Sequence, residues 1–238
     1  MSEWRAKRFW KAASVVEASG GYEVALDTRV VKTPAKAALL LPTRALAEAI
    51  AAEWDAQEDQ IDPLSMPFTR TANAAIDKVG LQRDEVARML ADYGDSDLLC
   101  YRADQPEALV TRQAAEWDPM LDWADAELGA RLEARSGVMH VPQQREALAR
   151  LSAQVHALSD FELAAFHDLV SLSGSLILGF AAARGARPID EIWDISRLDE
   201  IWQAEQWGAD DEAEATAAIK QSAFRHAKTF FDRVQPEF

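Results

Sequence analysis

The stretch Ile61-Asp62-Pro63-Leu64-Ser65-Met66-Pro67-Phe68 separates two parts of the sequence that differ in the secondary structure their residue patterns predict. It carries two prolines four positions apart, and proline fixes its own φ and has no backbone N–H to donate. Such a stretch predicts an extended linker. We therefore expect a domain boundary here, with a small α+β domain over residues 1–64 and a larger helical domain over residues 65–238.

Before this stretch the sequence predicts a small β-meander. Tyr22, Val24 and Leu26 alternate with polar or small residues, which places them on one face of a pleated strand. Further short strands are expected at Val15-Val16, at Val30-Val31-Lys32-Thr33 and at Ala38-Leu39-Leu40-Leu41. A sheet of this size needs a helix packed on it to be stable.

A helix that suits this role begins after Pro42. Thr43 has a hydroxyl that can accept a hydrogen bond from the first turn, as N-cap residues do. Leu46, Ile50 and Trp54 then recur every four residues, which is the spacing of one helical face. The sequence therefore predicts an amphipathic helix whose apolar stripe covers the meander.

The rest of the chain indicates an all-α domain, which we expect to resemble an orthogonal bundle. Trp117-Asp118-Pro119 has the form of a cap followed by a proline that opens a helix. The capping box from Ser159 to Glu162 predicts one long helix that continues through Gly174 and Gly179. A further single helix is expected from Pro188 to Trp207.

The charge balance excludes some classes of partner. The chain has 25 lysines and arginines against 40 aspartates and glutamates, a formal net charge of −15. Such a charge repels phosphate backbones and anionic lipids, so we expect no nucleic acid partner, and basic protein surfaces are better partners. The most apolar run, residues 169–183, is shorter than the ~20 residues that span a bilayer. We therefore expect no membrane insertion.

The sequence offers little sign of catalysis. It contains neither a Walker-type phosphate loop nor a dinucleotide-binding glycine pattern, and its four histidines occur singly. We therefore expect no cofactor, no metal and no catalytic residue. Its one cysteine, Cys100, cannot form an internal disulfide, which suits a reducing compartment. An alternative hypothesis is a helical enzyme that pairs His156 or His167 with a carboxylate, and another is a structural subunit that stays in its complex.

Eight tryptophans in 238 residues are the most distinctive feature of the composition. Each can fill the core or anchor an interface, because large aromatic side chains with a polar group are frequent at interface hot spots. Trp202 and Trp207 cannot both share a helix face with Ile195, Leu198 and Ile201, since five residues advance the helix by about 500°. One of the two is expected to meet another domain or a partner.

In order and spacing, several motifs together resemble one family, the assembly chaperones of the F-type ATP synthase that act on its alpha subunit. The first matching stretches are Lys7-Arg8-Phe9-Trp10, Tyr22-Glu23-Val24-Ala25-Leu26-Asp27, Ala52-Glu53-Trp54-Asp55-Ala56-Gln57 and Met66-Pro67-Phe68-Thr69. Later ones are Asp97-Leu98-Leu99-Cys100-Tyr101-Arg102, Glu116-Trp117-Asp118-Pro119 and Ser196-Arg197-Leu198-Asp199-Glu200, with Gln203, Trp207 and Gly208. The resemblance covers the chain from residue 7 to about residue 208.

The resemblance implies a function without catalysis. A member of this family binds the unassembled alpha subunit, prevents its aggregation and releases it for assembly with beta. We expect such a protein to act as a monomer. Mitochondrial members carry a presequence before the Arg-Phe-aromatic motif, which begins here at Arg8. The resemblance therefore implies either a bacterial, cytoplasmic protein or a processed form, and the mitochondrial matrix for the eukaryotic relatives.

The resemblance also selects residues. It implies a partner-binding set on the expected helix that ends at Trp207, and a structural set in the motifs around Trp54 and Trp117. The partner-binding set is Asp199, Glu200, Gln203 and Trp207 from the matching motif, with Gln206 added because helix spacing places it on the same polar side. The structural set is Trp54, Gln57, Trp117, Asp118 and Pro119. The family often has a glutamate directly after Ser-Arg-Leu, where this chain has Asp199 followed by Glu200, so either acid is a candidate for the partner contact. The polar side formed by Asp199, Gln203 and Gln206 is also compatible with a merely solvated face.

Overall fold

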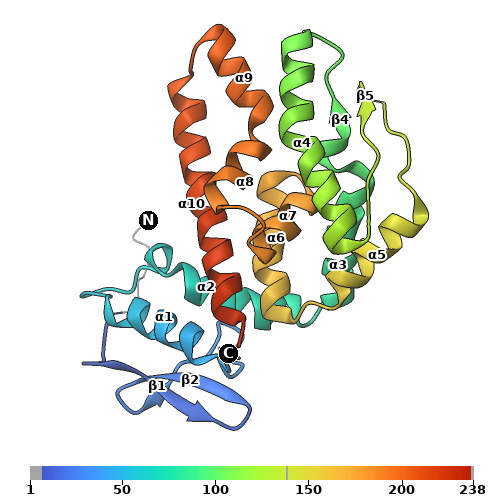
Figure 1. Cartoon of the computed structure of the whole chain (residues 1–238). Coiled ribbons are helices and arrows are strands. Elements are labelled where there is room, and N and C mark those ends of the chain that lie inside the picture. The colour runs from blue at the N-terminus through green and yellow to red at the C-terminus, as the bar shows by residue number, and fades with distance from the viewer. Residues whose placement is uncertain (1–6, 138, 237–238) are drawn as a thin grey trace. The chain divides into compact units, whose positions relative to one another are not determined.

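The fold was described from a computed structural model that covers residues 7–137 and 139–236. It is α+β, with a small β-sheet near the N-terminus followed by helices, as the sequence predicts (Figure 1). The helices are α1 Arg44–Asp55, α2 Pro67–Ala74, α3 Arg83–Ala91, α4 Glu107–Leu128, α5 Arg145–His156, α6 Asp160–Ser173, α7 Leu176–Arg184, α8 Ile189–Ser196, α9 Leu198–Trp207 and α10 Asp211–Val234. The strands are β1 Ala13–Ala18, β2 Gly21–Leu26, β3 Arg29–Val30, β4 Tyr101–Arg102 and β5 Arg135–Ser136. Across this described part of the chain, every helix is too short or too polar to cross a membrane.

Two compact units divide the chain differently from the expected domains. The first unit comprises residues 1–83, 159–165 and 229–238, and the second comprises residues 84–158 and 166–228. The expected boundary after residue 64 therefore falls within the first unit, which also takes in two later segments. The division into domains 1–64 and 65–238 stays a prediction.

The sheet of the first unit has the order β1-β2-β3 and is antiparallel. β1 pairs with β2 from Ala13 opposite Leu26 to Ala18 opposite Gly21. The expected fourth strand is present only as single bridges, one of which joins Tyr22 to Leu41. Gly21 allows this close approach, because a Cβ there would lie 2.4 Å from the carbonyl oxygen of Leu41.

Helix α1 confirms the prediction made from its apolar spacing. The hydroxyl of Thr43 accepts a hydrogen bond from the backbone N–H of Leu46 at 3.2 Å, so Thr43 is the N-cap. Leu46 and Ile50 are fully buried, and α1 packs against β1 and β2. Trp54 is half-buried and meets the ring of Trp10 edge to face, with centroids 5.3 Å apart.

The expectation of an extended linker over residues 61–68 is wrong. Pro63–Ser65 form a 3₁₀ turn and α2 begins at Pro67. Side chains from α1 and the residues just after it hold this segment in place: Gln57 Oε1 accepts from Asp62 N–H at 2.7 Å, and Glu53 accepts from Phe68 N–H at 2.6 Å. Both prolines occupy first-turn positions, where the missing N–H costs nothing. The two prolines start helical turns here instead of forming a linker.

The prediction that Pro119 opens a helix is also wrong. α4 runs without interruption from Glu107 to Leu128, with Pro119 inside it. Pro119 is exposed, so the carbonyl that lacks its N–H donor can be hydrated. A stripe of buried residues, on the side of α4 opposite Pro119, runs through both halves of the helix and holds them together. This stripe is Gln113, Trp117, Met120, Leu121, Ala124 and Leu128.

The long helix expected from Ser159 is broken into α6 and α7. The capping box itself is confirmed, because Ser159 N–H donates to Glu162 Oε2 at 2.8 Å. The break comes at Gly174, which has φ +70°, and Ser175 caps α7 by accepting from Leu178 N–H at 3.0 Å. α7 then folds back onto α6 so closely that a Cβ on Gly179 would lie 2.6 Å from Val170 Cγ2.

Asp97 ties the start of α7 to the turn before β4. Its carboxylate is fully buried and accepts backbone hydrogen bonds from Leu99 and Ile177, both at 3.0 Å. Burial raises the pKa of the Asp97 carboxyl to about 6, although these hydrogen bonds favour the ionised form. Asp97 therefore caps the 3₁₀ turn that follows it, and it does so as a buried carboxyl.

We expect Trp54→Arg to destabilise the first unit. The change removes the ring contact with Trp10 and places a charge beside the buried indole of Trp10. We expect the free energy of unfolding to fall by about 2 kcal/mol. Trp54→Phe keeps an aromatic ring and serves as the control in urea unfolding. A midpoint for Trp54→Arg equal to that of the wild type would contradict the structural role.

We expect the stability contribution of Asp97 to depend on pH. Because folding raises its pKa, ionised Asp97 destabilises the fold above the folded pKa, and protonation relieves this as the pH falls. Between about pH 7.5 and pH 5, the free energy of unfolding of the wild type should rise by about 1 kcal/mol relative to Asp97→Asn, which does not titrate. Urea titrations of both proteins at the two pH values measure this difference, and a constant difference would rule out the raised pKa.

Candidate protein-interaction surface

The single helix expected from Pro188 to Trp207 is two helices. α8 ends at Ser196 and α9 begins at Leu198, because Arg197 adopts φ −107° and ψ 14°, outside the helical range. α8 is the better packed of the two, with Ile192, Trp193, Ile195 and Ser196 buried, whereas Leu198 is the buried residue of α9. The rest of α9 is half-buried or exposed, which makes it a candidate for contact with another protein.

All five residues of the expected partner-binding set belong to α9. At 100° per residue they fall within a sector of about 120° around the helix axis. Glu200, Gln203, Gln206 and Trp207 are exposed, and Asp199 is half-buried. The structure therefore places the predicted set together on one continuous face, which we call the α9 face.

Trp207 is the tryptophan of this helix that points to solvent. It is 79% exposed at the last position of α9, while Trp202 is half-buried. Little of this side chain is therefore buried by the described part of the chain. Exposed tryptophans with polar neighbours are typical of interface anchors.

The two neighbouring acids of the α9 face differ in their surroundings. Asp199 Oδ1 accepts a hydrogen bond from Gln113 Nε2 on α4 at 2.7 Å. Gln113 is only 1% exposed, and its Oε1 accepts from the backbone N–H of Ala103 at 2.8 Å. Glu200 instead pairs at 2.7 Å with Arg197, the residue at the junction of α8 and α9. The side chain of Glu200 is 49% exposed. Asp199 thus positions α9, and Glu200 is the acid that a partner can reach.

Two further contacts hold α9 and its junction against α4. Arg112 Nη1 lies 2.6 Å from Glu205 Oε2, and the buried indole of Trp117 donates to the carbonyl oxygen of Ile195 at 3.0 Å. Asp118, from the same motif as Trp117, pairs with Arg102 at 2.8 Å. The sequence did not indicate the roles of Arg112 and Glu205, because these two residues lie 93 positions apart along the chain.

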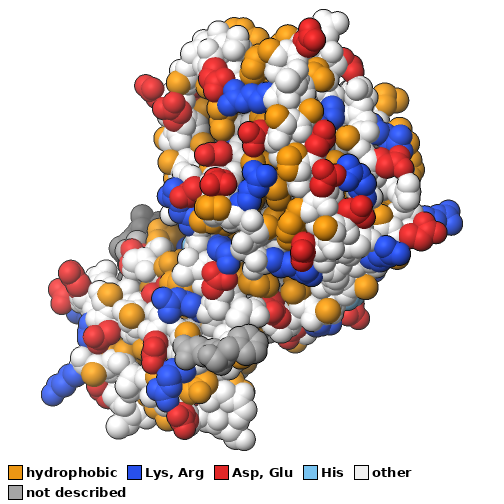
Figure 2. Space-filling model, in the orientation of Figure 1, with side chains coloured by type: hydrophobic (Ala, Val, Ile, Leu, Met, Phe, Trp, Pro, Cys, Tyr) orange, Lys and Arg blue, Asp and Glu red, His pale blue; other side chains and the backbone are white. Residues whose placement is uncertain are grey.

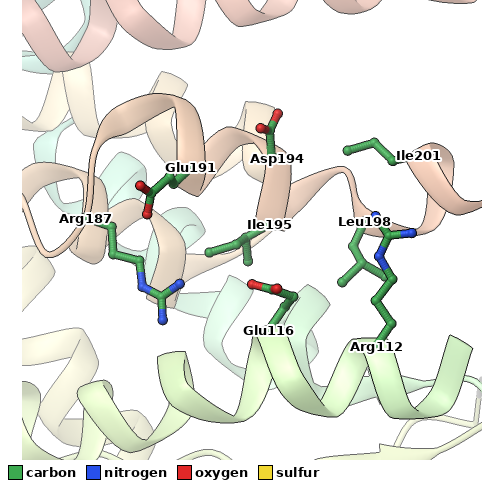
Figure 3. A pocket seen from close by; sticks show the side chains of 8 residues that line it. All are labelled: Arg112, Glu116, Arg187, Glu191, Asp194, Ile195, Leu198 and Ile201. Atoms are coloured by element: carbon green, nitrogen blue, oxygen red, sulfur yellow. The ribbon is translucent and has the colours of Figure 1, made fainter. Parts of the chain in front are cut away.

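A groove lies between α4 and the α8–α9 pair, with a volume of about 420 Å³ (Figure 3). Its apolar lining consists of Ile195, Leu198 and Ile201. Its charged lining consists of Arg112 and Glu116 on α4, Arg187 before α8, and Glu191 and Asp194 on α8. In Figure 3, Arg112 and Glu116 point from α4 toward the other two helices. We call this feature the α4–α8 groove.

On the face drawn in Figure 2, charged side chains are not gathered in one place. Figure 2 shows acidic, basic and hydrophobic side chains interspersed on the face drawn. The net charge of −15 is therefore not gathered into one acidic field on this face. Local arrangements such as the α9 face and the α4–α8 groove then decide what kind of partner can bind.

His156 and His167 each have a contact within their own helix, and Cys100 is a buried free cysteine. His156 Nδ1 lies 2.8 Å from the carbonyl oxygen of Ser152 in its own helix. His167 Nδ1 lies 2.9 Å from Asp168 Oδ1, and this hydrogen bond raises the pKa of His167. Burial raises the pKa of the Cys100 thiol above its usual range, which disfavours the nucleophilic thiolate. Among residues 7–137 and 139–236, no three histidine, cysteine, aspartate or glutamate side chains gather as metal ligands would.

Trp54 and Gln57, of the structural set, lie in the first compact unit. Gln57 is 4% exposed and joins the end of α1 to the following turn, since its Nε2 donates to Ser65 Oγ at 3.0 Å. Arg8 reinforces this corner by donating to the carbonyl oxygens of Asp55, at 2.7 Å, and of Gln57. Pro119 is the one member of the set that is exposed.

Fold and surface together define an α+β protein whose last helices present an exposed aromatic and polar face suited to binding another protein. A comparison with known families identifies the class more closely. The family model of the ATP12 chaperone protein matches residues 7–125, and the chain belongs to this family. The match confirms the resemblance to the ATP synthase assembly chaperones.

Individual relatives agree with this assignment. The chain is 25% identical over 219 residues to the mitochondrial protein atp12 of Schizosaccharomyces pombe, covering 87% of this chain and 75% of the relative. The crystal structure of Atp12 from Paracoccus denitrificans is 52% identical, covers 98% of this chain and all of its own, and superposes with a TM-score of 0.95. A point mutant of that Paracoccus protein gives 0.96 at 51% identity, with the same coverage. The Atu1473 protein of Agrobacterium tumefaciens gives 0.92 at 42% identity, covering 96% of this chain and 86% of its own.

We expect Asp199→Lys and Glu200→Lys to differ in stability although they are neighbours. Lysine at 199 leaves the buried amide of Gln113 without its acceptor, at a cost of about 1–3 kcal/mol. Lysine at 200 removes an exposed pair with Arg197 and should change the free energy of unfolding by no more than about 0.5 kcal/mol.

Urea unfolding of the two single variants tests this difference. Asp199→Asn is the control, because its amide oxygen can still accept from Gln113. Equal midpoints for Asp199→Lys and Glu200→Lys would mean that the Gln113–Asp199 hydrogen bond does not hold α9.

Proposed function

We propose that this chain is an assembly chaperone that binds the unassembled alpha subunit of the F-type ATP synthase. On this proposal it prevents aggregation of the alpha subunit and releases it for assembly with beta. Membership of the ATP12 chaperone family supports the role, and the exposed α9 face supports contact with a protein client. The observation that carries the proposal is the exposure of Trp207, which is 79% exposed at the end of the acidic helix α9. The chain that carries this helix belongs to a family of chaperones.

The α9 face has the composition of an interface centre with a polar rim. Trp207 provides a large apolar area, and Gln203 and Gln206 beside it can donate and accept hydrogen bonds. Glu200 adds a negative charge that a basic patch on the client would complement. Asp199 holds α9 to α4 by accepting a hydrogen bond from Gln113.

We further propose that the protein acts without catalysis, without a cofactor and as a monomer. Its relatives are named as chaperones, which supports a role in binding. We propose a cytoplasmic location, which the bacterial relatives support, while the mitochondrial relative supports the matrix for eukaryotic members. For the alternative hypothesis of an enzyme, His167 pairs with the adjacent Asp168, and His156 Nδ1 lies 2.8 Å from a backbone carbonyl of its own helix.

A structural subunit remains the competing binding role. A chaperone leaves its client, whereas a subunit stays with it. Copurification with free alpha subunit that is lost after assembly of the synthase favours the chaperone, and persistence in the finished complex favours the subunit. The same preparation tests for catalysis if turnover is measured.

We expect the double variant Glu200→Lys/Trp207→Ala to hold much less alpha subunit in solution than the wild type. It removes the apolar anchor and reverses the reachable charge, which together should cost a few kcal/mol of binding, roughly 2–4. The measurement is the fraction of aggregation-prone alpha subunit that stays soluble with each variant.

The matched control is Leu81→Ala/Glu127→Lys. Leu81 is 78% exposed and Glu127 is exposed, so the control makes the same kinds of change away from α9. Thermal midpoints of both double variants should stay near that of the wild type. Equal holding activity in both variants would remove the α9 face from the proposal.

A further inference from the structure

The α4–α8 groove is built of parts that the α9 face does not use. Ile195 and Leu198 are 5% and 3% exposed, and Ile201 is half-buried, so the groove has an apolar strip with one accessible side chain. The strip is bordered by charged side chains from α4 on one side and from α8 on the other (Figure 3). An apolar strip with charged borders is suited to a short segment of another polypeptide.

The borders carry an excess of negative charge. Arg112 is neutralised by Glu205 at 2.6 Å, which leaves Arg187 against Glu116, Glu191 and Asp194. Within the described chain, neither Glu116 nor Glu191 forms a salt bridge, and neither does Arg187. The groove therefore offers the carboxylates of Glu116 and Glu191 beside the strip, although Glu116 also attracts Arg112, and the guanidinium of Arg187 just before the N-terminus of α8. A ligand gains most here if it brings an apolar side chain with a basic neighbour.

The groove and the α9 face lie on different sides of α9. At 100° per residue, Ile201, which lines the groove, is rotated by about 100° from Glu200 and by about 160° from Gln203. Glu200 is the residue of the α9 face that lies nearest to Ile201 around the helix, so a polypeptide bound on both regions passes this side chain.

We infer that the α4–α8 groove binds a segment of the client chain in which an apolar residue lies next to lysine or arginine. The apolar side chain packs on Ile201, the accessible residue of the apolar strip, and the basic side chain pairs with Glu116 and Glu191. Arg187 binds a carboxylate or a backbone carbonyl of the same segment. This inference rests on the proposed function for the identity of the client, the alpha subunit.

Charge reversal in the groove is the first test. Glu116→Lys/Glu191→Lys should weaken the binding of purified alpha subunit by about tenfold. Asp125→Lys/Glu127→Lys makes the same change of charge on exposed positions of α4 outside the groove and should bind within about twofold of the wild type. If the first variant does not fold, Glu116→Gln/Glu191→Gln replaces it, with a loss of about threefold expected. Binding equal to the control overturns the groove.

Photochemical cross-linking locates the client segment directly. The full chain carries p-benzoylphenylalanine in place of Ile201 for the groove, Trp207 for the α9 face, or Glu127 as the control. Irradiation with alpha subunit, followed by peptide mass spectrometry, should link position 201 to a segment with an apolar residue beside lysine or arginine. Position 127 should give no product.

The outcomes separate the two proposals. A product at 207 without one at 201 overturns the groove and leaves the chaperone role standing, and a product at 201 on a segment without a basic residue overturns the charge recognition. If the wild-type chain fails to capture alpha subunit at all, the proposed function fails and the groove inference fails with it.

Discussion

A buried hydrogen bond joins α4 to the residues just before the α8–α9 junction. The indole of Trp117, fully buried on α4, donates to the carbonyl oxygen of Ile195 at 3.0 Å, two residues before the α8–α9 junction. A buried carbonyl without this donor would lose the contact with no water to replace it. The bond therefore fixes where α8 ends against α4, and α9 starts from that point. Arg102 packs over the same ring at 5.3 Å and pairs with Asp118, which keeps the motif rigid.

Helix α9 depends on this support because its own packing is slight. A ten-residue helix is marginal in isolation, and only Leu198 of α9 is buried. Polar contacts replace the missing apolar burial, with Gln113 held to Asp199 and Arg112 to Glu205. The outer side of the helix is thereby left free for exposed residues such as Trp207. The α9 face thus lies on a helix that is held in place by contacts with α4.

Acidic residues take different roles according to burial. Asp97 is a buried cap whose pKa burial raises to about 6, and Asp199 is a half-buried acceptor for Gln113. Glu200, Glu116 and Glu191 remain accessible to a client. A net charge of −15 by itself predicts only an affinity for basic surfaces. Only the accessible acids can contact another protein, and they lie in two candidate regions, the α9 face and the α4–α8 groove.

The sequence alone determined the α+β class, the capped and striped helix α1, and the residues of the α9 face, because apolar spacing, capping side chains and family motifs are local properties. Tertiary structure decided the rest. Pro63 and Pro67 start helical turns because Gln57 and Glu53 bond to the backbone there, and Pro119 lies within α4 because a buried stripe holds both halves of that helix. Which tryptophan is exposed, and which acid is tied to Gln113, follow from the break at Arg197 and from contacts between residues some ninety positions apart. Spacing along a chain specifies which side chains share a face, but packing against distant segments decides which of those faces meets solvent.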